Sequence, residues 1–365
     1  MRTQILTALT LAVAGLVACG MSGCSEDDPT GPAGRRTLHV PRQFDEIQDA
    51  IDAAAAGDLV LVAAGTYADS VVAENLLGIP QVVCVDLKSG VEVRSESGQS
   101  GDVILVGNPN NPVINCLDVD DEASLIGVTI TGGKSGLLGA RSSPAIVNCV
   151  FEGNHNPSQY GAGGGMYWDY SSPTITNCVF SDNSATTGGG AVFANESYPV
   201  LTNVVFSANT SPTSPNQPGS GGGLFVGDDS YARLTNCVFT TNHADSLGGA
   251  IMVSGGTVEL VNGNIHHNHT DGLGGAFFMN YRGHAVLTDV LVESNSSDQI
   301  GGGFYFRSST SLTAVNSRIL GNSAPAGADG FLREPYEVAV VSLRCCEVDT
   351  LQWVGPITVD DEGCE

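Results

Sequence analysis

The chain has 365 residues, 47 of them glycine, and carries 39 acidic against 14 basic side chains, a formal net charge of −25. Proteins bind DNA and RNA through basic contacts to phosphate, so this charge excludes nucleic acids as partners. It also opposes binding of polyanionic sugars unless Ca²⁺ or a local basic patch intervenes.

The N-terminal residues are expected to direct export rather than to fold. Arg2 precedes an apolar run from Ile5 to Ala18, which is typical of a signal peptide and shorter than the ~20 apolar residues that span a bilayer. We therefore assign residues 1–18 to a signal peptide and residues 19–36 to a flexible tether.

The end of this apolar run also predicts a membrane anchor. Leu16-Val-Ala-Cys19-Gly20 resembles the lipobox of bacterial lipoproteins, so lipidation is expected at Cys19, with Cys24 as the alternative. A lipid there would hold the protein on a membrane. We expect an outer-membrane, cell-surface or periplasmic lipoprotein, with release outside the cell as the alternative.

The following segment predicts one short helix and several strands. Asp58–Val62, Gly65–Tyr67 and Leu125–Ile130 have the composition of strands, and less regular strands are expected elsewhere in 80–133. Five apolar residues before them recur at helical spacing: Phe44, Ile47, Ala50, Ile51 and Ala54.

From residue 146 onward one phrase recurs seven times: an apolar residue, then Asn or Asp, then a final Asn six positions later. A period of this length indicates a repeat architecture. The final residues are Asn154, Asn183, Asn209, Asn242, Asn268, Asn295 and Asn322.

One repeat, Thr174–Asn183, predicts the local structure. Cys178 and Phe180 alternate with Val179 as in a short strand, and Asn177 tolerates the left-handed backbone of a tight bend. Strands this short must stack on those of the next repeat, which predicts a parallel all-β solenoid.

Two columns of the aligned repeats indicate how the coils stack. Large apolar residues three positions before the final Asn predict a core stripe: Phe151, Phe180, Phe206, Phe239, Ile265, Val292 and Ile319. Polar residues six positions before it predict an amide ladder: Asn148, Asn177, Asn203, Asn236, Asn262, Asp289 and Asn316. A third column, Cys149, Cys178 and Cys237, is interpreted as buried free thiols.

The pattern resembles the right-handed parallel β-helices of the pectin-lyase-like class. Residues 144–330 also resemble the repeats of chlamydial polymorphic outer-membrane proteins, which are marked by the motifs GGA-I and F-x-x-N. The first motif matches Gly248-Gly-Ala-Ile251, and the second matches Phe239, which is followed by x-x-Asn. The resemblance implies a single-stranded right-handed parallel β-helix over residues 37–365. It also implies that the short N-terminal helix caps the first coil.

The catalytic motifs of polygalacturonases are not matched. Neither N-T-D nor R-I-K occurs, and Gly283-His284-Ala285 lacks the second glycine of G-H-G. No catalytic residue is assigned, and no cofactor is expected. A Ca²⁺ site at Asp118, Asp120 and Glu122 is the alternative, since the two aspartates would share one face of a strand.

The histidines are not assigned to a metal site. His269 is expected to stack on His243 one coil away, but a third ligand is not evident. His266 and His267 are expected to face opposite sides of a strand.

A ligand groove is predicted where two long loops, 155–162 and 210–220, flank the short link 184–187. The candidate groove residues are Tyr160, Tyr167, Trp168, Asp169 and Tyr170, of which Tyr167 or Trp168 could instead fill the core. At the C-terminal end, a disulfide is expected between Cys364 and either Cys345 or Cys346.

These observations favour an exported, lipid-anchored β-helix that serves as a binding, adhesion or structural module. Its expected partner is a polysaccharide or another cell-surface ligand. The alternative is a polysaccharide lyase or glycoside hydrolase of the same fold.

Overall fold

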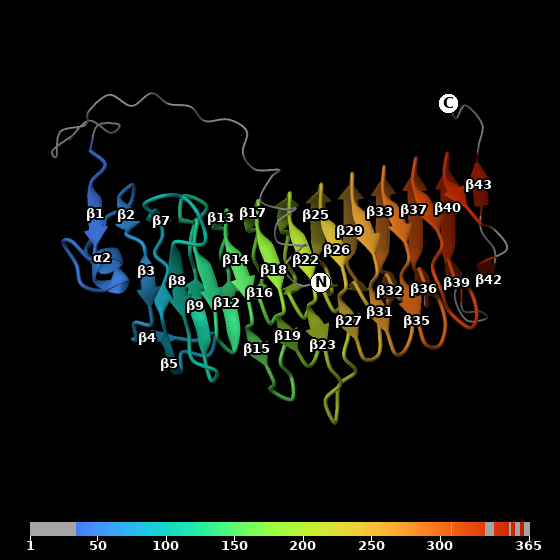
Figure 1. Ribbon diagram of the computed structural model, residues 1–365, viewed down its shortest axis with the longest axis horizontal. Coiled ribbons are helices and arrows are strands. Elements are labelled where there is room, and N and C mark those ends of the chain that lie inside the picture. Colours follow the sequence, from blue (N-terminus) through green and yellow to red (C-terminus); the bar gives the residue numbers. More distant parts are fainter. Residues whose placement is uncertain (1–33, 308, 333–338, 350–351, 355–357, 361–365) are drawn as a thin grey trace. The chain divides into compact units, whose positions relative to one another are not determined.

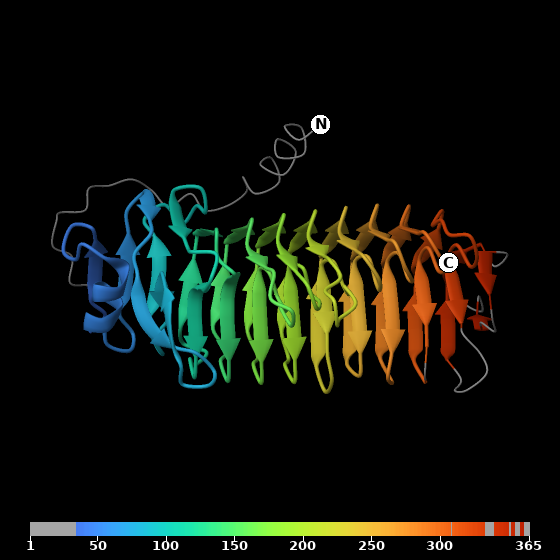
Figure 2. The ribbon, with the colours of Figure 1, turned by 90° about the horizontal axis from the view of Figure 1, so that it is seen from below.

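The computed structural model describes residues 34–307, 309–332, 339–349, 352–354 and 358–360. Residues from Thr37 onward form one compact unit. Its strands pair in parallel with those of the next coil, as the repeat predicted, and Figures 1 and 2 show successive strands side by side. Within the described residues no helix is long and apolar enough to cross a membrane.

Each coil contributes strands to three long sheets and, in the middle of the unit, to a short fourth sheet. The first sheet contains β1 (Thr37–Val40), β2 (Leu59–Val62), β7 (Glu92–Ser95), β10 (Ser124–Ile126), β13 (Ala145–Val147), β17 (Thr174–Thr176), β21 (Val200–Thr202), β25 (Tyr231–Thr235), β29 (Thr257–Val261), β33 (His284–Thr288), β37 (Ser311–Val315), β40 (Val340–Arg344) and β43 (Thr358–Asp360).

The second sheet follows the first around each coil. It contains β3 (Gly65–Tyr67), β8 (Val103–Val106), β11 (Thr129–Thr131), β14 (Val150–Glu152), β18 (Val179–Ser181), β22 (Val205–Ser207), β26 (Val238–Thr240), β30 (Asn264–His266), β34 (Leu291–Glu293), β38 (Arg318–Leu320) and β41 (Glu347–Val348).

The third sheet closes the coil, and the fourth lies between the second and the third along the chain. The third contains β6 (Val85–Asp86), β9 (Pro112–Leu117), β12 (Ser135–Ala140), β16 (Met166–Asp169), β20 (Val192–Asn195), β24 (Leu224–Val226), β28 (Ile251–Ser254), β32 (Phe277–Asn280), β36 (Phe304–Phe306), β39 (Gly330–Leu332) and β42 (Trp353–Val354). The fourth contains β15 (His155–Asn156), β19 (Ser184–Ala185), β23 (Thr210–Ser211), β27 (His243–Ala244), β31 (His269–Thr270) and β35 (Ser296–Ser297).

The helix α2 (Ile47–Ala53) caps the N-terminal coil, which confirms the expected capping helix. It buries Ile47, Ala50 and Ile51 and packs against β1, β2 and β6. Gln48 replaces the missing neighbour of the edge strand β6, because its side chain bonds both the N–H (2.9 Å) and the C=O (3.2 Å) of Asp86. An antiparallel hairpin, β4 (Val71–Glu74) and β5 (Pro80–Val83), was not predicted.

The core stripe is confirmed. The column from Phe151 to Ile319 is fully buried. The rings of Phe151, Phe180, Phe206 and Phe239 stack on one another, with centroids 5.0, 5.3 and 4.4 Å apart. The bend between first and second sheet is confirmed as well, since Asn177 has φ 54° and the other members of its column have φ between 50° and 56°. Cys149, Cys178 and Cys237 are buried free thiols.

The main amide ladder lies in a different column from the one predicted. The final Asn of each repeat, from Asn154 to Asn322, points inward and is almost completely buried. At each step the Nδ2 of one asparagine donates to the Oδ1 of the next coil's asparagine at 2.9–3.0 Å. The backbone N–H of the same residue donates to that Oδ1 at 3.0–3.2 Å.

The second Nδ2 hydrogen of these buried residues donates to a backbone carbonyl of the preceding coil, as in Asn209 to the carbonyl of Phe180 at 2.9 Å. All four hydrogen-bonding positions of an inner amide are thus filled. The predicted column forms a second, exposed ladder in which Asn177, Asn203 and Asn236 each donate to the preceding coil's Asn at 2.9–3.1 Å. Sequence columns alone did not show which of the two faces the core.

The buried ladder ends at a carboxyl group. Asp329 is fully buried, and its Oδ1 accepts from the Nδ2 (2.9 Å) and the N–H (3.2 Å) of Asn322. Its Oδ2 has no hydrogen-bond partner among the described residues. Burial raises the pKa of Asp329 above its ordinary value, more than the two bonds from Asn322 lower it.

Replacing Asn209 with Ala should destabilise the protein by about 3 kcal/mol or more. It leaves the backbone N–H and one Nδ2 hydrogen of Asn183 buried and unpaired, and it removes one of the two bonds to the Oδ1 of Asn242. The matched control is Asn203→Gly, which breaks the exposed ladder but keeps the left-handed backbone, and should cost under about 1 kcal/mol. Urea unfolding of both variants measures the difference, and equal losses would contradict the assigned role of the buried column.

Replacing Asp329 with Asn should stabilise the protein in a pH-dependent way. Because folding raises the pKa of this acid, its contribution to stability is fully present below the unfolded pKa of about 3.9 and is lost as pH rises through the folded pKa. The gain in Tm of Asp329→Asn over the wild type should therefore be near zero at pH 3.5 and reach a few degrees at pH 7. A gain that is constant with pH would refute the assignment.

Candidate functional site

The two long loops touch each other instead of forming the two walls of a groove. Figure 1 shows both protruding at the edge that carries β15 and β23. The hydroxyl of Ser214 donates to the carbonyl of Gln159 at 3.0 Å, and the N–H of Thr187 donates to the carbonyl of Gly161 at 2.7 Å. The short link 184–187 therefore lies against the first loop, and the expected groove above it is closed.

A hollow of about 630 Å³ lies instead on the N-terminal side of the loop 155–162. Its wall is built from the hairpin β4–β5, the loop before β9, the start of β12 and the loop after β15. Its lining includes Asn75, Gln81, Asn110, Asn111, Lys134, Asn156, Tyr160 and Tyr167.

The lining is rich in amides and contains one cation. Lys134, one of two lysines in the chain, lines the hollow, and none of the described lining residues is Asp, Glu or His. Asn156 is almost completely buried, and its Oδ1 has no hydrogen-bond partner within the described part of the chain. Gln81 is oriented by a bond to Asn115, which in turn donates to Asp86 at 2.8 Å. The hollow therefore offers hydrogen-bonding groups without negative charge.

An aromatic stripe runs from the hollow along the outer face of the third sheet. Tyr167, Phe193 and Phe225 are in register, with ring centroids 5.5 and 4.5 Å apart and interplanar angles of 6° and 20°. They are half-buried. Burial raises the pKa of Tyr167 to about 12, so its phenol stays protonated at neutral pH.

The stripe is covered only in its C-terminal half. There Met252, Phe278 and Tyr305 are buried under Leu247, Leu273 and Ile300. The corresponding link residues in the N-terminal half are small, namely Ala162, Gly188 and Ser220. The aromatic surface that continues from the hollow is consequently open to solvent near Tyr167 and Phe193.

The predicted groove residues separate into three groups, and the alternation of side chains along β16 turns Trp168 away from Tyr167 and Asp169. Tyr160 and Tyr167 line the hollow. Trp168 points inward and is fully buried, so it belongs to the core. Asp169 accepts a bond from Asn195 at 2.9 Å, and Tyr170 donates to Glu196 at 2.7 Å; neither lines the hollow.

The other acidic candidates have structural partners. β9 ends at Leu117, so Asp118 and Asp120 do not share a strand face as expected. Asp118 pairs with Arg141 at 2.6 and 2.8 Å, and the bonds from Arg141 lower the pKa of Asp118. Asp120 accepts from the N–H groups of Gly90 and Ala123, and Glu122 is exposed.

The cysteines named from the sequence are only partly within the described residues. Cys345 is disulfide-bonded, whereas the Sγ of Cys346 lies 3.3 Å from the carbonyl of Ala314. Cys19, Cys24 and Cys364 lie outside the described residues, so their expected lipidation and pairing stay predictions.

Two expectations about the histidines are wrong. His267 has φ 57° in a turn, which brings its Nδ1 to 2.8 Å from the Nδ1 of His266, so the two do not face opposite sides. His243 and His269 do stack, with ring centroids 5.4 Å apart, but a third ligand group is present: Asp271. Its position two residues after His269, on the loop that follows β31, was the signal that could have revealed it.

Comparison with solved structures gives distant similarities. The chain is similar to an alginate lyase from Paenibacillus sp. str. FPU-7, with 12% identity, a TM-score of 0.45, and 88% of this chain and 99% of that chain covered. It is similar to the A-module of mannuronan C-5 epimerase AlgE4 from Azotobacter vinelandii, with 16% identity, a TM-score of 0.49, and 87% and 93% covered. No curated protein matches the sequence.

The family comparison covers most of the chain. The model described as a right handed beta helix region matches residues 89–243 and 216–334, which together span well over half of the sequence. The parallel sheets, the stacked core stripe and the N-terminal cap agree with this match. The chain therefore belongs to the right-handed β-helix family.

Proposed function

We propose that this protein is an exported β-helix that binds a saccharide in the hollow beside Tyr160 and Tyr167. The observation that carries the proposal is that two tyrosine side chains and several amide side chains line one hollow. Sugar rings present C–H faces that pack on aromatic rings and hydroxyl groups that bond amides. The half-buried ring edges of Tyr167 and Phe193 extend this surface for further sugar units.

The charge of the hollow favours a saccharide that bears an acidic group. The chain as a whole repels anions, but the described lining has no carboxylate and contributes Lys134. A carboxylate or sulfate on one sugar unit would pair with this ammonium group, while neutral units would contact the amides and rings.

The composition of the hollow supports binding over cleavage. Glycoside hydrolysis ordinarily uses a pair of carboxyl groups, and among the described lining residues there is none. Tyr167 is a poor base at neutral pH because burial raises its pKa to about 12. A polysaccharide lyase or glycoside hydrolase remains the alternative function.

The cellular setting belongs to the same proposal. The signal peptide at residues 1–18 and a lipid on Cys19 would place the hollow at a cell surface or in the periplasm. An adhesive role is part of this proposal, on the grounds of the expected anchor and the repeat system. Detection of a lipid-modified Cys19 or Cys24 by mass spectrometry would test the anchor.

Tyr160→Ala should weaken saccharide binding roughly threefold to tenfold, because one aromatic face is lost from an exposed position that does not support the fold. Tyr198→Ala is the matched control, since Tyr198 is similarly exposed and does not line the hollow. A glycan array would identify the ligand, and calorimetry would compare the two variants. Failure of every glycan to bind, or an equal effect of Tyr198→Ala, would contradict the proposal.

Lys134→Gln should reduce affinity for an acidic oligosaccharide while leaving affinity for a neutral analogue unchanged, because it removes the one positive charge among the described lining residues. Binding of the acidic ligand should also become less sensitive to salt. Incubating the protein with polysaccharides tests the alternative function. New reducing ends or unsaturated products that vanish in Tyr160→Ala would show cleavage in the hollow.

A further inference from the structure

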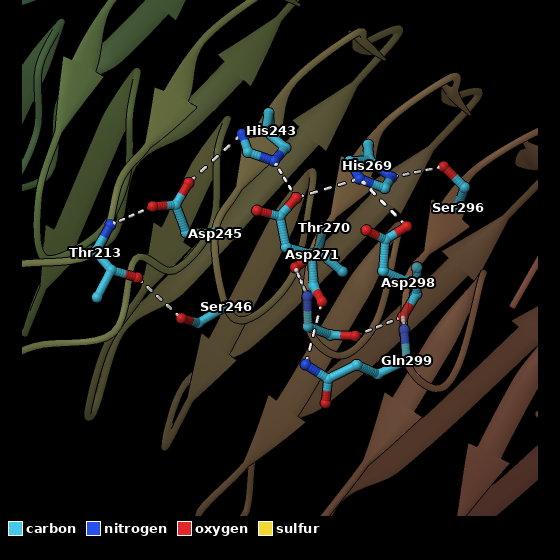
Figure 3. Close-up of polar contacts among 12 residues, drawn as sticks. Thr213, His243, Asp245, Ser246, His269, Thr270, Asp271, Ser296, Asp298 and Gln299 are labelled. Carbon is cyan, nitrogen blue, oxygen red and sulfur yellow. Dashed lines mark hydrogen bonds and ion pairs between the residues drawn. The ribbon is translucent and has the colours of Figure 1, made fainter. Parts of the chain in front are cut away.

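A cluster of histidines and aspartates lies on the fourth sheet, apart from the residues that line the hollow. His243 begins β27 and His269 begins β31, and these neighbouring strands are paired in register. Equivalent side chains on adjacent parallel strands point the same way, so the two imidazoles stack, with an interplanar angle of 10°. Figure 3 shows both rings above Asp271.

Asp271 completes a convergent set of three ligand atoms. Its Oδ1 lies 2.9 Å from the Nε2 of His243 and 3.3 Å from the Nε2 of His269. One ligand atom from each of the three residues lies within 4.8 Å of the others. In a tetrahedral zinc site with bonds of about 2.0–2.1 Å, ligand atoms lie about 3.3 Å apart, which is close to the two distances from Asp271. The two imidazoles, stacked nearly parallel, would tilt toward each other to bind one ion.

Outer contacts orient the two rings. The Nδ1 of His269 lies 2.8 Å from the hydroxyl of Ser296, and the Nδ1 of His243 lies 3.8 Å from a carboxylate oxygen of Asp245. Asp245 is itself held by the N–H of Thr213, on the long loop 210–220, at 2.8 Å. Partners at Nδ1 leave Nε2 to face Asp271, which is the arrangement that metal-binding histidines commonly show (Figure 3).

A fourth group stands close to this set. One carboxylate oxygen of Asp298 lies 3.7 Å from the Nε2 of His269. The side chains of His243 and His269 are about one-third exposed, and those of Asp271 and Asp298 are more than half exposed. An ion could therefore enter from solvent, and water could complete its coordination.

We propose that His243, His269 and Asp271 form a site for Zn²⁺, with water in the fourth position and Asp298 beside it. Two imidazole nitrogens and one carboxylate suit Zn²⁺ and not Ca²⁺, which takes oxygen ligands. Because His243 belongs to one coil and His269 and Asp271 to the next, the bound ion would join two coils. This site is independent of saccharide binding.

The same contacts without a metal would form an ion-paired network. The hydrogen bond from His243 lowers the pKa of Asp271, as a simple histidine–carboxylate pair also would. Metal titration separates the two interpretations, because only a metal site gives stoichiometric and selective uptake.

The full chain, carrying no polyhistidine tag, should be titrated with Zn²⁺ and with Ca²⁺ by calorimetry, and its bound metal counted by elemental analysis. We expect about one Zn²⁺ per chain, no comparable Ca²⁺ binding, and a rise in Tm with Zn²⁺. His243→Ala and Asp271→Asn should each weaken Zn²⁺ binding at least tenfold.

The matched control is the double variant His266→Ala with His267→Ala, which removes another close histidine pair and should leave Zn²⁺ binding unchanged. Absence of Zn²⁺ binding by the wild type would overturn the proposal. So would binding that persists in Asp271→Asn and His243→Ala, or binding that disappears in the control.

Discussion

The buried asparagine ladder is the interaction on which the rest of the structure depends. Strands of two to six residues cannot hold a coil in shape, so each coil takes its position from its neighbours. The amides from Asn154 to Asn322 fix that position at one corner, because each joins two coils through its side chain and backbone at once. With the corner fixed, the residues that follow enter the third and fourth sheets in constant register.

Because the register is constant, each residue lies beside the equivalent residue of the next coil. This register stacks Phe151 on Phe180 in the core, and on the outside it stacks Tyr167 on Phe193 and His243 on His269. A chemical group that occurs once on a surface can therefore become a row by simple repetition of a coil. The proposed saccharide surface and the proposed zinc site are both short rows of this kind. Lys134, beside the first row, departs from the repeat, whereas Asp271 in the second is itself a column member, equivalent to Asp245 and Asp298.

Much of the fold could be predicted from the sequence because the repeat has strong local signals. The large apolar side chains in the column of Phe180 had to be buried, and Asn177 is a residue type that adopts the left-handed backbone of the bend. The inner ladder was harder to predict, because both asparagine columns recur at the same period. They differ only in whether the backbone directs the side chain into the core or toward solvent. The hollow could not be predicted, because it joins the hairpin near Asn75 to Tyr160, residues that no sequence spacing relates.

The hydrogen bonds of the buried ladder all run the same way. Every amide from Asn154 to Asn295 directs its Nδ2 toward the next coil, so the side-chain dipoles add along the stack, and the final N–H groups, those of Asn322, need an acceptor. Asp329 supplies one, and a carboxyl group offers that end of the row acceptor oxygens in place of a further amide. An internal coil could thus be duplicated or deleted without changing the chemistry of either end, which makes the length of the solenoid an easily evolved property of this chain.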